Sequence, residues 1–136
     1  MVKKILVAFD GSEQAKRALD LGLEIADKFS ANTVLLGVVD YMPIIDEEYV
    51  NNLKRRYEEI LSEALVNAQS AKPNLQITEM LTEGRPADKI IEKARDGKFD
   101  MVVMGSRGSG GISEFIRGSV SDKVMDKAPC PVMIVK

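Results

Sequence analysis

Short apolar runs alternate along the chain with longer segments in which apolar residues recur every three or four positions. The runs at 4–9, 33–39 and 100–104 are almost continuously apolar, which is typical of strands in a parallel sheet with both faces covered. Residues 75–82 alternate apolar and polar side chains and predict a more peripheral strand, and 132–135 predict a closing strand. The pattern therefore predicts strands separated by amphipathic helices.

The helices are expected after Ser12, over about residues 46–70, from Pro86 to Asp96, and over about 118–127. Ser12 is a preferred helix cap, and proline is favoured in the first helical turn. The apolar residues of the first three segments share one face of each helix. They are Ala15, Ala18, Leu19, Gly22, Ala26 and Phe29; Val50, Leu53, Tyr57, Ile60, Leu61, Ala64, Leu65 and Ala68; and Ala87, Ile90, Ile91 and Ala94. Alternation of strands and helices predicts one α/β domain over residues 1–136, a parallel sheet with helices on both faces.

Composition limits the functions available to the chain. Its 136 residues are 45% hydrophobic and 29% charged, as in globular proteins. No apolar run approaches the roughly 18 residues of a membrane span, and the N-terminal sequence lacks a signal-peptide pattern, so we expect a cytoplasmic protein without membrane contact. A net charge of −2 argues against a surface for duplex nucleic acid, which needs clustered lysine and arginine.

The absence of histidine excludes several kinds of catalytic and metal site. Without histidine the chain has no Cys/His zinc site and no Ser-His-Asp or Cys-His pair. The single cysteine, Cys130, lies between two prolines at the start of an apolar run. We expect it to be a small buried hydrophobic residue, with a reactive thiol as the less favoured alternative.

A glycine- and serine-rich segment follows the fourth predicted strand. It begins Gly105-Ser106-Arg107-Gly108, and nine residues separate Gly108 from Gly118-Ser119 at the predicted start of the last helix. Glycine lets the backbone approach an anion closely, and free N–H groups at a helix N-terminus attract phosphate. The segment therefore favours phosphate binding, although a glycine-serine surface loop remains an alternative.

Two other glycine motifs do not fit this segment. A Walker A loop requires Gly-Lys-Ser/Thr, which the segment lacks. The dinucleotide fingerprint would begin at Gly108 and Gly110, but Ser113 stands where it requires glycine or alanine. That fingerprint is also expected after the first strand of a βαβ unit rather than after the fourth.

The spacing of Gly105, Gly108 and Gly118-Ser119 resembles the ATP-binding branch of the universal stress protein family. The resemblance covers essentially the whole chain, from Ile5-Leu6-Val7-Ala8-Phe9-Asp10-Gly11-Ser12, through Gly84-x-Pro86, to Ala128-Pro129-Cys130-Pro131-Val132. It implies a doubly wound, Rossmann-like fold of the adenine nucleotide alpha hydrolase type, with five parallel strands in the order 3-2-1-4-5. Ligands of such sheets bind where the strand order reverses, outside the carboxyl ends of the strands.

The resemblance also implies a set of nucleotide-binding residues. The segment Ala8, Phe9 and Asp10 would contact the adenosine, and the backbone of Val38 would meet the adenine. The ribose and phosphates would contact Met104, Gly105, Gly108, Gly118, Ser119 and Val120. Apart from the resemblance, Arg107 and Arg117 flank the glycine-rich segment, where each could screen phosphate charge or could be a solvated side chain. The chain departs from many members at Ala8, where they have proline, and at Gly37, where they have histidine.

Two roles are considered for the Asp10 side chain. As a residue beside Gly11 at a helix start, it could simply shape a turn. Its position beside the expected strand reversal favours a contact with a ribose hydroxyl or with a Mg²⁺ ion bound together with ATP.

Binding is favoured over catalysis because the sequence offers no P-loop lysine and no second acid clearly paired with Asp10. A slow Mg²⁺-dependent ATPase and a nucleotide-free scaffold are the alternatives to a regulatory ATP-binding protein. The strand 132–135 is apolar on both faces, and such an edge pairs readily with another chain. We therefore expect a homodimer formed through this strand, as the resemblance also implies.

Overall fold

The computed structural model describes residues 1–40, 46–106 and 114–136, and for 114–118 only the backbone. The strands are β1 (Lys4–Ala8), β2 (Asn32–Asp40), β3 (Ile77–Gly84), β4 (Met101–Gly105) and β5 (Val132–Val135). The helices are α1 (Glu13–Phe29), α2 (Glu47–Ala71), α3 (Pro86–Asp96) and α4 (Glu114–Lys127). All neighbouring strands are parallel, in the order β3-β2-β1-β4-β5, which confirms the expected sheet.

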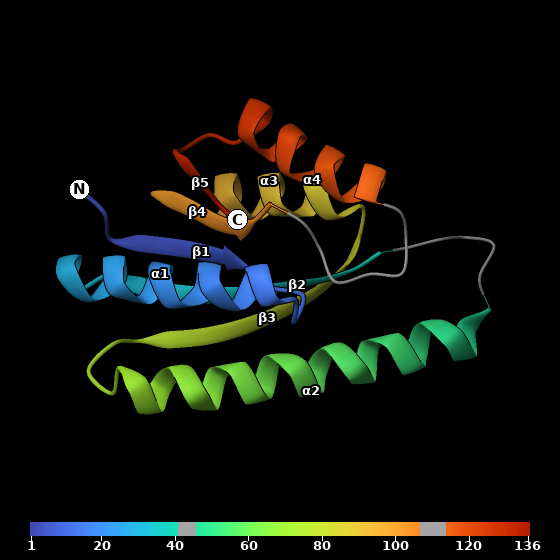
Figure 1. Cartoon of the computed structure of the whole chain (residues 1–136), viewed down its shortest axis with the longest axis horizontal. Helices are drawn as coiled ribbons and strands as arrows, with labels where there is room; N and C mark the ends of the chain where they lie inside the picture. Colours follow the sequence, from blue (N-terminus) through green and yellow to red (C-terminus); the bar gives the residue numbers. More distant parts are fainter. Residues whose placement is uncertain (41–45, 107–113) are drawn as a thin grey trace.

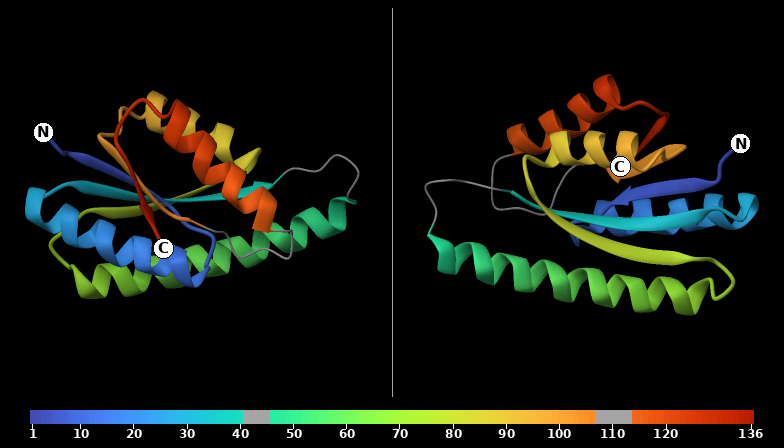
Figure 2. Two further views of the ribbon diagram at one scale, coloured as in Figure 1. Left: turned by 45° about the horizontal axis from the view of Figure 1, so that its top comes forward. Right: turned by 180° about the vertical axis from the view of Figure 1, so that it is seen from behind.

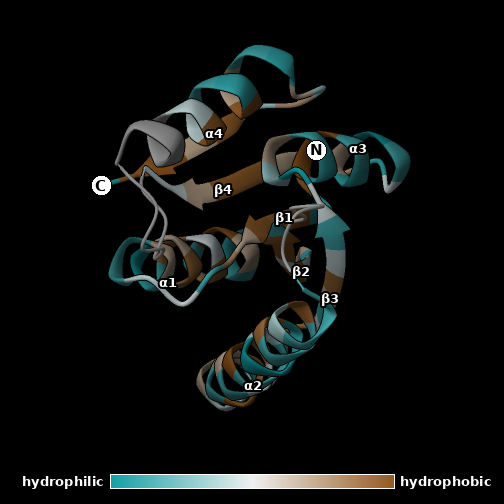
Figure 3. Ribbon diagram, turned by 90° about the vertical axis from the view of Figure 1, so that its right-hand side faces the viewer, coloured by the Kyte–Doolittle hydropathy of each residue, from teal (hydrophilic) through white to brown (hydrophobic). Residues whose placement is uncertain are grey.

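The sheet is covered by a pair of helices on each face. Helices α1 and α2 lie on one face, and α3 and α4 lie on the other (Figures 1 and 3). The long α2 runs beside β3, at the opposite edge of the sheet from β5 (Figure 2). In the described part of the chain, no helix is both long enough and apolar enough to cross a membrane.

Alternate residues of the central strands build two separate hydrophobic cores. Val7, Leu35 and Val103 lie in the core beneath α1 and α2, whereas Leu6 and Leu36 lie in the core beneath α3 and α4. Each of these side chains is at most 1% exposed. The continuous apolar runs of the sequence follow from this arrangement, because both faces of each central strand are buried.

Helix α1 begins at the predicted cap. The Ser12 Oγ accepts a hydrogen bond from the Ala15 N–H at 3.1 Å, and the helix ends at Ser30 in a left-handed conformation. The predicted core face is buried except for Phe29, whose side chain is 46% exposed. That expectation was wrong because Phe29 ends the helix at the amino ends of the strands, where the sheet no longer extends beneath it.

The remaining predicted helix faces are largely confirmed. In α2, only Leu61, Ala64 and Ala68 are fully buried, because the helix covers the edge of the sheet and its N-terminal half extends beyond it (Figure 1). Helix α3 has Pro86 at its first position and buries three of its four predicted core residues, leaving Ile91 half-buried.

Two differences from the sequence analysis concern the C-terminal part. Helix α4 begins at Glu114, four residues before its predicted start at 118. Cys130 is half-buried against the core beneath α3 and α4 rather than fully buried. Burial, with a smaller contribution from the Asp100 carboxylate, raises the pKa of the Cys130 thiol, which keeps it in its unreactive protonated form near neutral pH.

Candidate functional site

The strand order reverses between β1 and β4. From β1 the chain crosses to β2 and then to β3 on one side, and later fills β4 and β5 on the other side. The segments that leave the carboxyl ends of β1 and β4 therefore diverge toward opposite directions of the sheet. In doubly wound folds this divergence leaves the crevice in which ligands bind.

Four of the predicted nucleotide-binding residues lie in or against one apolar cluster beside this reversal. Ala8 and Met104 are each the next residue after the paired Val7 and Val103 of β1 and β4. Both belong, with Val38 of β2, to the apolar cluster beneath α3 and α4, and Val120 of α4 packs against the same cluster. Val38 and Met104 are nearly fully buried in this cluster, whereas Ala8 is half-buried at its margin.

Phe9 does not share this position. Its side chain is 4% exposed and lies in the other core, beneath α1 and α2, although the sequence analysis grouped it with Ala8 and Asp10. Its backbone N–H donates to the Leu36 carbonyl at 2.8 Å. The reason is the alternation of side chains along an extended segment, which sends the neighbours Ala8 and Phe9 to opposite faces.

Asp10 shapes the turn between β1 and α1. Its Oδ1 accepts a hydrogen bond from the Ser12 N–H at 2.9 Å, and Gly11 between them has a φ of 83°, which glycine adopts without strain. This geometry supports the turn hypothesis from the sequence analysis. The second hypothesis, a contact with a ribose hydroxyl or Mg²⁺, stays a prediction.

Gly105 lies where β4 passes the N-terminus of α1. A Cβ atom at this position would lie 2.8 Å from the Gln14 Cβ and 3.1 Å from its carbonyl carbon. The absence of a side chain therefore lets β4 approach α1 closely. Glycine at 105 is therefore a packing requirement, in addition to the phosphate contact predicted from the sequence.

The rest of the glycine-rich motif lies in different surroundings. Gly118 and Ser119 are inside α4, in its second turn, and not at the helix N-terminus as predicted. In an α-helix their N–H groups point to the carbonyl groups four residues earlier. Arg107 and Gly108 lie outside the described residues.

Charged and phenolic groups that the sequence analysis did not select lie near Asp10. Asp40 ends β2, where burial raises the pKa of its carboxyl group, an effect that the Arg85 guanidinium opposes. The pKa of the Tyr57 phenol of α2 is raised to about 12, mainly by burial and then by the carboxylates of Asp10 and Asp40, with Arg56 opposing them. Because the carboxylates of Asp10 and Asp40 both act on the pKa of Tyr57, the three side chains lie near one another at the carboxyl edge of β1 and β2.

The Tyr57 ring reaches this position because β2 has a glycine beneath it. A Cβ atom on Gly37 would lie 3.2 Å from Cδ1 of Tyr57 and 2.9 Å from Cδ1 of Leu61. From the sequence, Tyr57 was predicted only as part of the apolar face of its helix. The sequence did contain a signal for this cluster of Asp10, Asp40 and Tyr57. Asp10 stands just after the first buried strand, and Asp40 is the last residue of the second.

The profile of the universal stress protein family matches residues 1–136. The chain belongs to the universal stress protein family. A universal stress protein of Thermus aquaticus, from the region 3′ of the QAH/OAS sulfhydrylase, is 38% identical over 143 residues, with all of both chains covered. This agrees with the family resemblance found in the sequence.

Solved structures of the family share the fold. The universal stress protein UspA from Lactobacillus plantarum has a TM-score of 0.84 at 25% identity, with 98% of this chain and 97% of that chain covered. A universal stress protein in complex with cAMP has a TM-score of 0.78 at 26% identity, again with 98% and 97% coverage. One solved structure similar to this chain therefore contains an adenine nucleotide, cAMP.

Proposed function

We propose that this universal stress protein binds an adenine nucleotide, ATP in the first instance, at the carboxyl edge of β1 and β4, and acts as a regulatory protein of the stress response. The observation that carries the proposal is the convergence of Ala8, Val38 and Met104 in one apolar cluster at the strand reversal. An adenine ring packs on apolar side chains beside backbone polar groups, and the half-buried Ala8 at the margin of this cluster would supply such a contact. The relative in complex with cAMP supports the same class of ligand.

The proposal assigns roles by position along this edge. The base would lie near Ala8 and the backbone of Val38, and Phe9 would contribute its backbone only, because its side chain is in the opposite core. Asp10 would accept a hydrogen bond from a ribose hydroxyl. Gly105, Arg107, Gly108, Gly118, Ser119 and Val120 complete the proposed ribose and phosphate contacts.

The structure adds one requirement to the phosphate contacts. For Gly118 and Ser119 to donate their N–H groups to a phosphate, residues 114–117 must leave the helix, since the carbonyl groups of 114 and 115 are otherwise their partners. The last helix would then begin at Gly118, as the glycine motif predicts. Nucleotide binding is in this view coupled to unwinding of the first turn of α4.

Mg²⁺ would bind together with the nucleotide. Among the described residues there is no group of three or more acidic or cysteine side chains able to hold a metal ion. Mg²⁺ commonly uses one or two carboxylates and completes its shell with phosphate oxygens and water. Asp10 would be the protein ligand in such an arrangement.

The experiment is a comparison of nucleotide binding by the wild type and by Asp10→Asn. The asparagine oxygen can still accept the Ser12 N–H, so the turn is kept while the charge is lost. Loss of a charge-assisted hydrogen bond to the ribose weakens ATP binding by roughly tenfold. The nucleotide released from denatured, freshly purified protein identifies the ligand, and recovery of no adenine nucleotide together with no binding of AMP, ADP or ATP would refute the proposal.

We also propose that the chain forms a homodimer through β5. This strand is at the edge of the sheet, and all four of its residues are half-buried. The Ser106 N–H bonds to the Val135 carbonyl and the Val102 N–H to the Pro131 carbonyl. By the alternation of a strand, the N–H group of Ile134 faces away from β4, free to pair with a second copy.

Ile134→Pro tests the dimer because it removes that outward N–H without removing a bond to β4. Light scattering is expected to report a dimer for the wild type and for the control Ile134→Val, and a monomer for Ile134→Pro. A wild-type monomer at micromolar concentration, or an Ile134→Pro dimer as tight as the wild type, would contradict this interface.

A further inference from the structure

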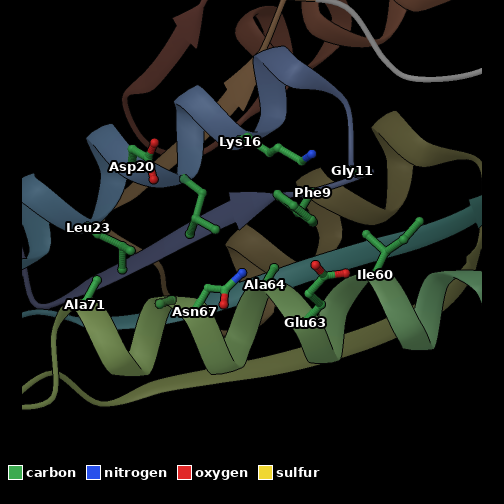
Figure 4. A pocket seen from close by; sticks show the side chains of 12 residues that line it. Phe9, Gly11, Lys16, Asp20, Leu23, Ile60, Glu63, Ala64, Asn67 and Ala71 are labelled. Carbon is green, nitrogen blue, oxygen red and sulfur yellow. The ribbon is translucent and has the colours of Figure 1, made fainter.

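A cleft of about 400 Å³ separates α1 from α2 on the sheet face opposite the apolar cluster of Ala8, Val38 and Met104. Its base is apolar and includes Phe9, Leu19, Leu23, Ala64 and Ala68. Figure 4 shows these surroundings, with the two helices forming the walls. The volume falls within the range of small-molecule sites, which bury an apolar body and orient it with a few polar groups.

The rim of the cleft carries an excess of negative charge. Asp20 lies on α1, and Glu63 and Asn67 extend from α2 toward α1 (Figure 4). Within the described ranges, neither Asp20 nor Glu63 has a hydrogen bond or an ion pair. Among the described residues that line the cleft, the one cation is Lys16, whose Nζ is 3.5 Å from Oε1 of Glu13, which offsets its charge.

We propose that this cleft binds a small organic cation with an apolar body, such as an aryl- or alkyl-substituted amine. The apolar base would take the hydrocarbon part, and the carboxylates of Asp20 and Glu63 would face the ammonium group, with the Asn67 amide oxygen as a further acceptor. The matching of charges selects a cation over an anion. The same body without charge would gain burial but no pairing at the rim.

This site is separate from the proposed nucleotide site and does not depend on it. Phe9 nevertheless links the two, since its side chain forms part of the cleft base and its backbone directly precedes Asp10. Gly11 also touches α2, because a Cβ atom there would lie 3.0 Å from Cγ2 of Ile60. A ligand that spans α1 and α2 would therefore also order the turn between β1 and α1.

The probe for the test is 2-(1-naphthyl)ethylamine, which is protonated at pH 7. Its matched controls are the neutral 2-(1-naphthyl)ethanol and the anionic 1-naphthylacetate. Titration of the ¹⁵N-labelled full chain, followed by amide chemical shifts, is expected to give saturable changes confined to residues 9–23 and 60–71. The amine is expected to bind about fivefold more tightly than the alcohol, and the acetate least tightly.

Variants test the rim carboxylates and the space within the cleft separately. The double variant Asp20→Asn/Glu63→Gln is expected to bring the affinity for the amine down to that for the alcohol. The control Glu48→Gln/Glu58→Gln removes the same charge from exposed positions of α2 outside the cleft and should leave it unchanged. Ala71→Trp, at an exposed position of the cleft wall, should weaken all three probes.

Several results would overturn the proposal. One is the absence of saturable shifts at millimolar amine, and another is equal affinity for the amine and the acetate. Shifts centred on the carboxyl edge of β1 and β4 would assign the probe to the other site. An increase in molecular mass by light scattering on adding the amine would indicate that the cleft is an interface between copies. Urea unfolding of each variant verifies that the fold is retained.

Discussion

At the residue scale, substitution of single glycines distinguishes a packing requirement from a ligand contact. Gly105→Ala would force a Cβ atom to within 2.8 Å of the Gln14 Cβ and 3.2 Å of the Ala15 nitrogen. Because backbone atoms of α1 cannot move as a flexible side chain can, we expect a loss of about 1–3 kcal/mol in the free energy of unfolding. Urea unfolding of the nucleotide-free protein measures it.

Gly22→Ala is the matched control for Gly105→Ala. Its Cβ atom would meet only side-chain atoms, with Cγ2 of Val7 at 3.2 Å, and alanine gains about 1 kcal/mol over glycine inside a helix. We expect little net change. If Gly105→Ala were as stable as the wild type and still weakened ATP binding, Gly105 would be needed for the ligand and not for packing.

Tyr57 supplies a prediction for alkaline pH. Its pKa is raised to about 12, by burial and then by Asp10 and Asp40. The folded state keeps the phenol proton longer than the unfolded state does, so this group's contribution to stability is lost as the pH rises from about 10 toward 12. Tyrosinate absorbance should show a late component that Tyr57→Phe removes and that Tyr49→Phe, at an exposed phenol, leaves in place.

If the tyrosinate absorbance of Tyr57→Phe kept the whole late component, Tyr57 would not lie in the environment described.

The aspartates and this tyrosine also illustrate the limits of prediction at this scale. The sequence predicted the Ser12 cap and the turn at Asp10 because both depend on neighbours in the chain. It did not predict the side-chain direction of Phe9 or the approach of Tyr57 to Gly37, which depend on contacts between distant segments.

At the scale of elements, the start of α1 depends on one hydroxyl. The Ser12 side chain is 8% exposed and accepts the Ala15 N–H at 3.1 Å. Ser12→Ala leaves that N–H without its partner, and we expect a loss of about 1 kcal/mol in the free energy of unfolding. Ser12→Asp, which retains an acceptor, should recover most of it, and equal stability of Ser12→Ala and the wild type in urea would show that the cap contributes little.

The positions of most helices and strands could be predicted because the spacing of their apolar residues matches the faces that they bury. The strands β1 and β2 are buried on both faces and have continuous apolar runs. The start of α4 could not be predicted in this way. Gly118-Ser119 has the composition of a helix start, whereas the helix begins at Glu114, because the preceding residues are compatible with a helix and glycine inside one costs only about 1 kcal/mol.

At the scale of the whole molecule, the strand order followed from the family resemblance and is confirmed. Alternating strands and helices alone predict a parallel sheet but do not determine which strand lies beside which. The cleft between α1 and α2 was not predicted, because its volume depends on how far apart two helices lie on the sheet. Ala8, Val38 and Met104 were assigned to the candidate nucleotide site from the family resemblance. They lie in or against one core beneath α3 and α4, and their contact with a nucleotide stays a prediction.

The most direct test of the central claim is a calorimetric titration of the wild type and Gly118→Val with ATP in the presence of Mg²⁺. Valine at 118 would crowd the phosphates, and it is a better helix former than glycine, so the urea midpoint should not fall. The account predicts saturable binding to one site per chain, weakened at least about tenfold by Gly118→Val. No heat from the wild type, or equal affinity in the variant, would contradict it.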